Sequence, residues 1–384
     1  MNKNIVVCCD GTANEFAADN TNVVKLYSTL VHDQPSQQTY YHPGIGTMEP
    51  PGALTPFRRR MARGLGLAFG AYLENDIRDA YAFLMQTYEP GDRVFLFGFS
   101  RGAYTVRAVA SLVRMYGLLR PGNEATIPYA IRMMMAIQKG RTSQGNQVGY
   151  RQLVADYFDL AGRFKATMSR PCTLHFVGVW DTVSSVGWID NPLKLPFSAD
   201  NGEIAVGRHA VALDERRAFF RTNLWRVGDG PSELHGPVDL LQVWFPGVHC
   251  DVGGGYPEAE SGLSKLSLEW MLNEAQPHGL IVDLARRDAV LGGSAPYVRP
   301  DSNADTHESL KGAWKLAEYV PKRHFDFATR KEEWRANRSR RRTIPPKSVI
   351  HWSVYERGDS YVEKLGLPPD AIQFAKTSQR VPTR

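Results

Sequence analysis

The sequence predicts an α/β fold in which a mostly parallel sheet carries helices on both faces. Short apolar runs typical of buried strands, such as residues 4–9 and 94–97, alternate with longer stretches whose apolar residues recur every three or four positions. The resulting order of strand, helix, strand, helix favours parallel strands joined by crossover helices. Ligand sites of such sheets lie at the carboxyl ends of the strands.

The N-terminal elements follow this order. Residues 4–9 form the first predicted strand, which leads directly into the Asp-Gly-Thr loop at 10–12, and residues 38–41 form another. The segment 50–64 is rich in Pro, Gly and Arg, as surface loops are. A long helix is predicted over 65–88, where the apolar spacing is helical and a Pro-Gly turn follows.

A sharp turn between a strand and a helix is the most informative motif. The strand at 94–97 is followed by Gly98-Phe99-Ser100-Arg101-Gly102 and then by an amphipathic helix. Strand, G-x-S-x-G and helix form the context in which a nucleophilic serine projects from a strained turn. A glycine-rich turn without function is the alternative, which the two matching flanks disfavour. The sequence therefore predicts a nucleophile at Ser100.

Two insertions elaborate the predicted domain, which we expect to span residues 1–384 as one unit. Helical patterns within 120–170 predict a lid or cap that lies above the carboxyl edge of the sheet, over the active site. Its methionines at 133–135 suit either a surface that repacks around acyl chains or an ordinary core. Residues 184–236 are expected to be irregular, apart from one helical piece near 210–220.

The later strands end in residues that a serine nucleophile requires. Strands are predicted at 173–180 and 238–245, and beyond residue 276 we expect loops and short helices. Asp181 directly follows the first of these strands, and His249 lies just past the second. A serine needs a base, and the base needs a carboxylate to orient it. In α/β-hydrolase folds these partners follow the serine in the order acid, then histidine.

Other residues fit these roles less well. Histidines before Ser100 break the chain order, His175 lies inside a predicted strand, and the rest fall in irregular regions or past the last predicted strand. Asp251 is the main alternative acid to Asp181, or else it braces the glycine turn that follows it. A hard-cation site around Asp251 or Asp10 matches no known ligand spacing.

An oxyanion hole needs two N–H donors fixed where negative charge develops. Arg101, the residue after the nucleophile, supplies one backbone N–H, and Gly11 or Thr12 in the loop after the first strand is the candidate for the other. Asp10 is unexpected beside a developing anion. We expect it either to hold its loop by accepting backbone N–H groups or to pair with the Arg101 side chain.

The composition is that of a sizeable globular chain. Of 384 residues 43% are hydrophobic, and the four cysteines form no C-x-x-C pair, so neither a disulfide framework nor a metal site is expected. No apolar run reaches the roughly twenty residues of a membrane span, and the start of the chain lacks a secretory signal pattern. We expect a protein that is cytoplasmic as synthesised, with signal-independent export left open.

Positive charge is concentrated in two arginine clusters, and the net charge is +6. Such clusters are either solvated loops or a surface that attracts anionic phospholipid head groups. No aromatic-interleaved motif accompanies them, so nucleic acid is not an expected partner; the oligomeric state is not predicted. The clusters are Arg58, Arg59, Arg60 and Arg63, and Arg335, Arg338, Arg340, Arg341 and Arg342.

Several segments together resemble a known family. They are C-C-D-G-T at 8–12, Y-H-P-G-I-G-T at 41–47, G-F-S-R-G-A-Y at 98–104, V-W-D-T-V at 179–183 and F-P-G-V-H-C-D-V-G-G-G-Y at 245–256. The chain is similar in these motifs to the α/β-hydrolase family that includes the phospholipase effectors of bacterial type VI secretion. The likeness extends over nearly the whole chain.

The resemblance implies an α/β-hydrolase core with a triad of Ser100, Asp181 and His249. We therefore expect a serine hydrolase of the lipase or phospholipase type, which cleaves carboxylic esters through an acyl-enzyme without a cofactor. The expected partner is a lipid or another acyl ester. Two alternatives stay open: a soluble esterase, thioesterase or acyltransferase for small acyl substrates, and a non-catalytic binding module on a hydrolase scaffold.

Overall fold

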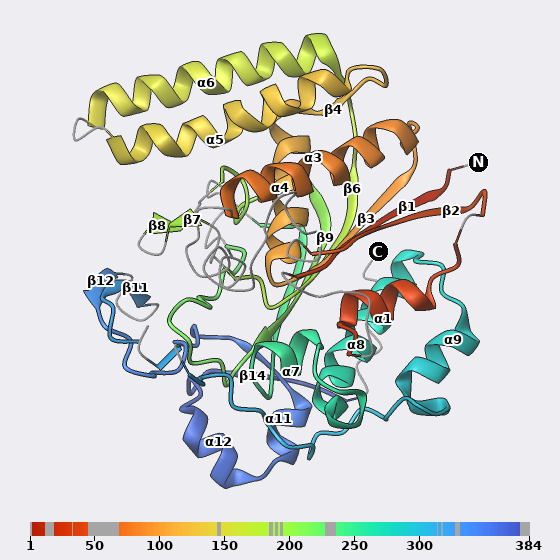
Figure 1. Ribbon diagram of the computed structural model, residues 1–384, viewed down its shortest axis with the longest axis vertical. Coiled ribbons are helices and arrows are strands. Elements are labelled where there is room, and N and C mark those ends of the chain that lie inside the picture. Colours follow the sequence, from red (N-terminus) through yellow and green to blue (C-terminus); the bar gives the residue numbers. More distant parts are fainter. Residues whose placement is uncertain are drawn as a thin grey trace, which may run out of the picture.

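An eight-stranded sheet forms the centre of the protein, and every strand pairing within it is parallel (Figure 1). The predicted α/β class with a mostly parallel sheet is therefore confirmed. In sheet order the strands are β14 (Ile372–Phe374), β13 (Val349–His351), β10 (Asp239–Phe245), β9 (Ile204–Ala212), β6 (Leu174–Trp180), β3 (Arg93–Phe99), β1 (Asn4–Cys9) and β2 (Gln37–His42).

The computed structural model describes most of the chain. The described residues are 2–11, 19–32, 34–44, 69–143, 147–183, 187–188, 191–192, 195–226, 236–312, 314–315, 318–326 and 331–376. Residues 65–68 of the predicted long helix and the arginine cluster at 58–63 lie outside them. The rest of that helix is present as α3 (Phe69–Thr87).

Helices cover both faces of the sheet, because alternate side chains of each strand point to opposite faces. In β1, Ile5 and Val7 belong to the core beneath α3 and α4 (Arg101–Tyr116), whereas Val6 and Cys8 belong to the core beneath α1 (Asn22–Thr29) and α8 (Gly262–Ala275) (Figure 1). The shorter helical elements are α7 (His249–Gly253), α9 (Leu284–Asp288), α11 (Trp352–Glu356), α12 (Asp359–Leu365), the 3-10 turns η1 (Glu124–Thr126), η2 (Glu258–Glu260) and η3 (Gln276–His278), and the π-helical turn η4 (Ala289–Gly293).

The predicted lid consists of two helices, α5 (Ile127–Ser143) and α6 (Gln147–Met168), closed at their base by the short strands β4 (Leu118–Leu119) and β5 (Ser169–Arg170). The pair packs on α3 and α4 as an outer layer over one face of the sheet (Figure 1). The methionines at 133–135 are buried in this contact, as the core alternative predicts. These contacts lie over a face of the sheet rather than at its carboxyl edge, so a role as a lid over the active site stays a prediction.

The segment expected to be irregular contains a central strand. β9 lies between β6 and β10, so the helical piece predicted near 210–220 is wrong. Arg208 and His209 interrupt the apolar pattern of this strand, yet both are buried, although the sequence predicts a surface position for His209. The Arg208 guanidinium pairs with the Glu274 carboxylate at 2.5 Å. Buried polar side chains that have partners are compatible with a central strand.

The C-terminal third adds strands to the loops and short helices predicted there. β13 and β14 extend the sheet beyond β10, although each has three residues. Runs this short carry too little alternation to be recognised in a sequence. Two small hairpins complete the described strands: β7 (Gly187–Trp188) with β8 (Asn191–Pro192), and β11 (Lys322–Asp326) with β12 (Lys331–Arg335).

Candidate active site

The turn between β3 and α4 places Ser100 at the carboxyl edge of the sheet. Its backbone has φ 57° and ψ −117°, a region that side chains rarely occupy. The flanking glycines permit this turn: a Cβ at Gly102 would lie 2.1 Å from the Cys9 carbonyl oxygen, and one at Gly98 would lie 2.5 Å from that of Gly102. The structure therefore has the strand, strained turn and helix that the motif predicts.

Ser100, His249 and Asp181 form a continuous chain of hydrogen bonds. The His249 Nε2 atom lies 2.8 Å from the Ser100 Oγ, and its Nδ1 atom lies 2.5 Å from the Asp181 Oδ2. Asp181 directly follows β6, and its backbone N–H donates to the Ala210 carbonyl of β9. Three separate segments thus bring a hydroxyl, an imidazole and a carboxylate into the arrangement of a nucleophile, a base and an orienting group.

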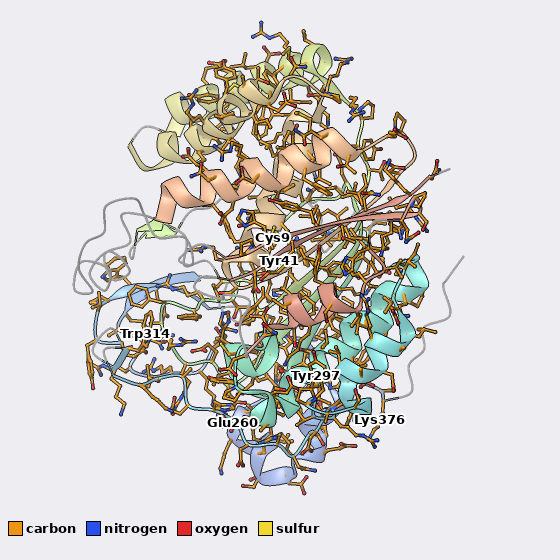
Figure 2. All side chains as sticks on the ribbon, turned by 45° about the vertical axis from the view of Figure 1, so that its right-hand side comes forward. Cys9, Tyr41, Glu260, Tyr297, Trp314 and Lys376 are labelled. Carbon is orange, nitrogen blue, oxygen red and sulfur yellow. The ribbon has the colours of Figure 1, made fainter. Side chains whose placement is uncertain are left out.

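Aromatic rings hold the His249 imidazole from two sides. The Phe99 ring lies 4.6 Å from it and the Phe220 ring 4.9 Å, centroid to centroid. Phe220 in turn contacts Trp314, whose side chain is 39% exposed. Figure 2 shows Trp314 at the outer side of the molecule. A chain of aromatic contacts therefore leads from the surface to the imidazole.

The protonation states suit base catalysis. Burial lowers the pKa of His249 below its ordinary value, although the hydrogen bond to Asp181 opposes this shift, so the imidazole is neutral near pH 7. Burial alone would raise the pKa of Asp181, but the Arg342 guanidinium and the hydrogen bond from His249 hold it far below its usual range. A neutral base next to an ionised carboxylate can accept the proton of Ser100.

Sequence reasoning missed the contact between Arg342 and Asp181. The Arg342 Nη1 and Nη2 atoms donate to the Asp181 Oδ1 and Oδ2 at 2.6 and 3.0 Å, and the arginine side chain is only 8% exposed. Its place in an arginine cluster predicts a surface residue, and this prediction is wrong. Of that cluster, Arg338 and Arg340 are exposed. The sequence contains no signal that separates Arg342 from its neighbours.

Asp251 does not replace Asp181 as the partner of His249. Its carboxylate accepts the backbone N–H of Val248 at 2.9 Å and that of His307 at 3.1 Å, and it contacts the His307 Nδ1 at 2.6 Å. Asp251 therefore braces the turn that precedes His249, whereas the sequence suggests that it braces the glycine turn that follows it. Burial raises the pKa of Asp251, and the hydrogen bonds from Val248 and His307 oppose that shift.

The loop after β1 lies beside the Ser100 turn, since a Cβ at Gly102 would lie 2.5 Å from the Asp10 carbonyl oxygen. The Asp10 carboxylate accepts the backbone N–H of Gly11 at 2.6 Å and the hydroxyls of Thr21 and Tyr41 at 2.7 and 2.9 Å; Figure 2 shows Tyr41 next to Cys9 at this edge of the sheet. Asp10 thus holds its own loop, as one of the two hypotheses predicts. The Gly11 N–H could act as an oxyanion donor only after giving up its hydrogen bond to the Asp10 carboxylate. Thr12, the other candidate, lies outside the described residues.

Arg101 provides the backbone that follows Ser100. Its N–H opens α4, at the N-terminus of the helix, where backbone dipoles favour negative charge. Its side chain is buried, and burial lowers the pKa of the guanidinium, which the Asp76 carboxylate opposes. In the part of the chain that the structure describes, no group of three His, Cys, Asp or Glu side chains is placed to bind a metal ion.

Membrane crossing has no candidate among the described helices, since none is both long and apolar enough.

Comparisons with known proteins add a family assignment. A yeast protein, "Uncharacterized protein YEL023C" of Saccharomyces cerevisiae (strain ATCC 204508 / S288c), is 37% identical over 228 residues, which are 57% of this chain and 32% of that protein. A crystal structure of an uncharacterized protein from Pseudomonas aeruginosa aligns with 20% identity and a TM-score of 0.42, over 73% of this chain and 46% of that one. The Tle1 effector bound to the VgrG spike of the type 6 secretion system aligns with 19% identity and a TM-score of 0.35, over 68% and 53%.

The chain thus spans about a third of the yeast relative and about half of each solved chain. Residues 3–274 match the family described as "T6SS, Phospholipase effector Tle1-like, catalytic domain". This range contains β1, the Ser100 turn, Asp181 and His249. The chain therefore belongs to the family of Tle1-like phospholipase effectors, which it matches in their catalytic domain.

Proposed function

We propose that the protein is a serine esterase that cleaves a carboxylic ester of a phospholipid or related lipid through an acyl-enzyme. The hydrogen-bonded chain of Ser100, His249 and Asp181 carries this proposal. The family supports a lipid substrate, and the aromatic contacts from Trp314 to His249 provide apolar surface next to the nucleophile.

The geometry supports the following acylation step. Ser100 Oγ attacks the ester carbonyl carbon while its proton moves to the His249 Nε2. The Asp181 carboxylate holds the Nδ1–H and stabilises the imidazolium that forms. The negative oxygen of the tetrahedral intermediate is assigned to the backbone N–H of Arg101, with Gly11 or Thr12 as the second donor.

The intermediate collapses when the bond to the leaving oxygen breaks and His249 returns its proton to that oxygen. An alcohol, which for a phospholipid is a lysophospholipid, then leaves, and the acyl group remains on Ser100. Water attacks this ester, His249 accepts the water proton, and the second collapse releases a carboxylic acid and restores the serine hydroxyl. His249 thus accepts and returns one proton in each half of the cycle.

A substrate panel with product analysis tests the proposal. We expect the protein to release fatty acid from glycerophospholipid vesicles and micelles, and a fluorophosphonate probe to label the peptide that contains Ser100. Mass analysis of the lysolipid identifies the ester bond that is cleaved. Faster turnover of short-chain esters, acyl thioesters or acyl transfer to an alcohol would favour the small-substrate alternatives. Absence of both labelling and hydrolysis would favour a binding module.

We also propose that the aromatic rim next to the β11–β12 hairpin contacts anionic membranes. The rim consists of Trp314, Tyr319, Val320 and Trp334, which are 39–69% exposed. Arg338 and Arg340 are exposed nearby, and the Arg338 N–H donates to the Glu318 carbonyl at the start of the rim segment. Exposed aromatic rings next to arginines suit the head-group region of a bilayer.

Vesicle binding tests this surface. Each arginine near an anionic bilayer contributes about 1 kcal/mol, so the double variant Arg338→Gln/Arg340→Gln is expected to bind phosphatidylglycerol vesicles roughly ten- to thirty-fold more weakly in co-sedimentation. Leu284→Ser, at a 65% exposed site on α9, is the control and should bind as the unmodified protein does. Equal binding by the arginine variant would rule out this surface as the membrane contact.

A further inference from the structure

Arg342 bonds both oxygens of the Asp181 carboxylate, which the chemistry of a serine hydrolase does not itself require. Its two terminal nitrogens each contact one oxygen of Asp181. A planar guanidinium that bonds both oxygens of a carboxylate fixes the plane and the rotation of that carboxylate, which a point charge does not. The Asp181 Oδ2 that faces Arg342 is the same atom that contacts the His249 Nδ1.

The surroundings hold Arg342 itself in place. Its Nε and Nη2 atoms donate to the Phe220 carbonyl at 3.0 and 2.6 Å, and its Nη1 donates to the Ala212 carbonyl at 3.1 Å. Ala212 ends β9 and also donates its N–H to the Asp181 Oδ1 at 3.0 Å. Phe220 lies against the His249 ring. Arg342 thus connects the carboxylate to two segments that border the imidazole.

We propose that Arg342 is a positioning residue, which holds the Asp181 carboxylate in the orientation that aligns His249 and limits how strongly that carboxylate favours a protonated imidazole. The inference rests on the proposed function of the triad. It assigns to an arginine from the C-terminal third a role in a site whose other members lie within residues 3–274. In this role Arg342 does not contact the substrate but acts through Asp181.

The other charged groups around the imidazole do not replace Arg342. Glu215 accepts the backbone N–H of His249 at 3.3 Å, and the same carboxylate pairs with Arg217 at 2.8 Å. These two opposite charges largely offset each other at the imidazole. Burial keeps the pKa of His209 at about 3, so this neighbour is neutral near pH 7. Arg342 also contributes to the lowered pKa of Glu215, but the carboxylate that its guanidinium bonds is that of Asp181.

Removal of the charge has a defined electrostatic direction. In Arg342→Met, the buried Asp181 carboxylate no longer has a guanidinium beside it. It therefore stabilises the protonated form of the His249 imidazole more strongly. We therefore expect the pKa of the His249 imidazole to rise and the acid limb of the kcat/KM profile to move to higher pH. Loss of orientation should lower kcat about ten- to a hundred-fold while KM for a soluble ester changes little.

A conservative variant separates charge from geometry. Arg342→Lys keeps the positive charge but cannot bond both carboxylate oxygens in one plane. We expect the acid limb to stay near its position in the unmodified protein, while kcat falls by about ten-fold because the orientation of Asp181 is lost. Unchanged kcat in this variant would overturn the positioning role even if Arg342→Met failed to fold.

A double-mutant cycle tests whether Arg342 acts through Asp181. In the Asp181→Asn background, Arg342→Met should lower kcat by less than about three-fold, because the carboxylate that it positions is already absent. A further loss equal to that seen with Asp181 intact would overturn the inference. Arg208→Met is the matched control: it removes another buried arginine, which pairs with Glu274 and Asp239, and kcat of its folded fraction should be unchanged.

Titration of His249 by NMR, after selective ¹⁵N labelling of histidine, needs no substrate. We expect the imidazole of Arg342→Met to titrate at higher pH than that of the unmodified protein, and that of Arg342→Lys at nearly the same pH. An unshifted imidazole in Arg342→Met would overturn the electrostatic part of the inference. This readout distinguishes the two proposals, since lack of ester hydrolysis by the unmodified protein would reject the proposed function and leave the titration result valid.

Discussion

Ser100→Ala is expected to lower kcat for ester hydrolysis by about 10⁴- to 10⁶-fold. The variant removes the hydroxyl oxygen that lies 2.8 Å from the His249 Nε2 and that forms the acyl-enzyme in the proposed mechanism. Initial rates with a soluble short-chain ester, followed by titrated acid release, measure the loss. Fluorophosphonate labelling should disappear in the same variant.

The fold should survive this change, because alanine keeps the Cβ and because the strained turn depends on the space at Gly98 and Gly102. Ser111→Ala is a matched control in α4, the helix that follows Ser100, where a buried serine donates to the Arg107 carbonyl at 2.8 Å. It should retain full kcat, with at most about 1 kcal/mol lost in stability. Residual hydrolysis above a few per cent in Ser100→Ala would reject Ser100 as the nucleophile.

The features that the sequence predicted well are those in which local pattern and chemistry agree. The turn at Ser100 is recognisable because strand, glycine spacing and helix all occur within one short segment. Asp181 and His249 are recognisable because Asp181 directly follows one apolar strand and His249 lies just past another, and the carboxyl ends of parallel strands share one edge of the sheet. The structure places these three residues in hydrogen-bond contact.

The features that could not be predicted depend on contacts between distant segments. β9 contains Arg208 and His209, whose burial is tolerable only because partners on other elements satisfy them. Arg342 has the sequence context of a surface arginine, and only its approach to Asp181 across 161 positions shows otherwise. Pattern recognition treats a charged residue as exposed unless its partner is known.

Distant partners also explain the turn before His249. Gly247 has φ 100°, and a Cβ there would lie 2.3 Å from the Asp251 Cβ, so the glycine is needed for the carboxylate to reach the Val248 N–H. His307, which the sequence places outside the site, contacts that same carboxylate. His249 is therefore held by two carboxylates in different ways: Asp181 contacts its ring, and Asp251 fixes the backbone that precedes it.

Asp181→Asn is expected to lower kcat by about 10³- to 10⁴-fold, because an amide does not stabilise the imidazolium and can favour the wrong imidazole tautomer. It also leaves the Arg342 guanidinium buried without its anion, which should cost about 3–5 kcal/mol of unfolding free energy. Asp239→Asn is the control: its carboxylate pairs with Arg208 but is 45% exposed, so kcat should not change and the stability loss should be smaller.

The pH dependence of stability separates this ion pair from a packing defect. The pKa of Asp181 is far lower in the folded protein than in the unfolded chain, where it is about 3.9. The carboxylate therefore contributes stability that is fully present above about pH 5 and is lost as pH falls below the unfolded value. Urea unfolding should show the largest difference between the unmodified protein and Asp181→Asn at pH 7, and a smaller one at pH 3. A difference that stays constant with pH would mean that the variant acts through packing, because only an ionised Asp181 can neutralise Arg342 and orient His249.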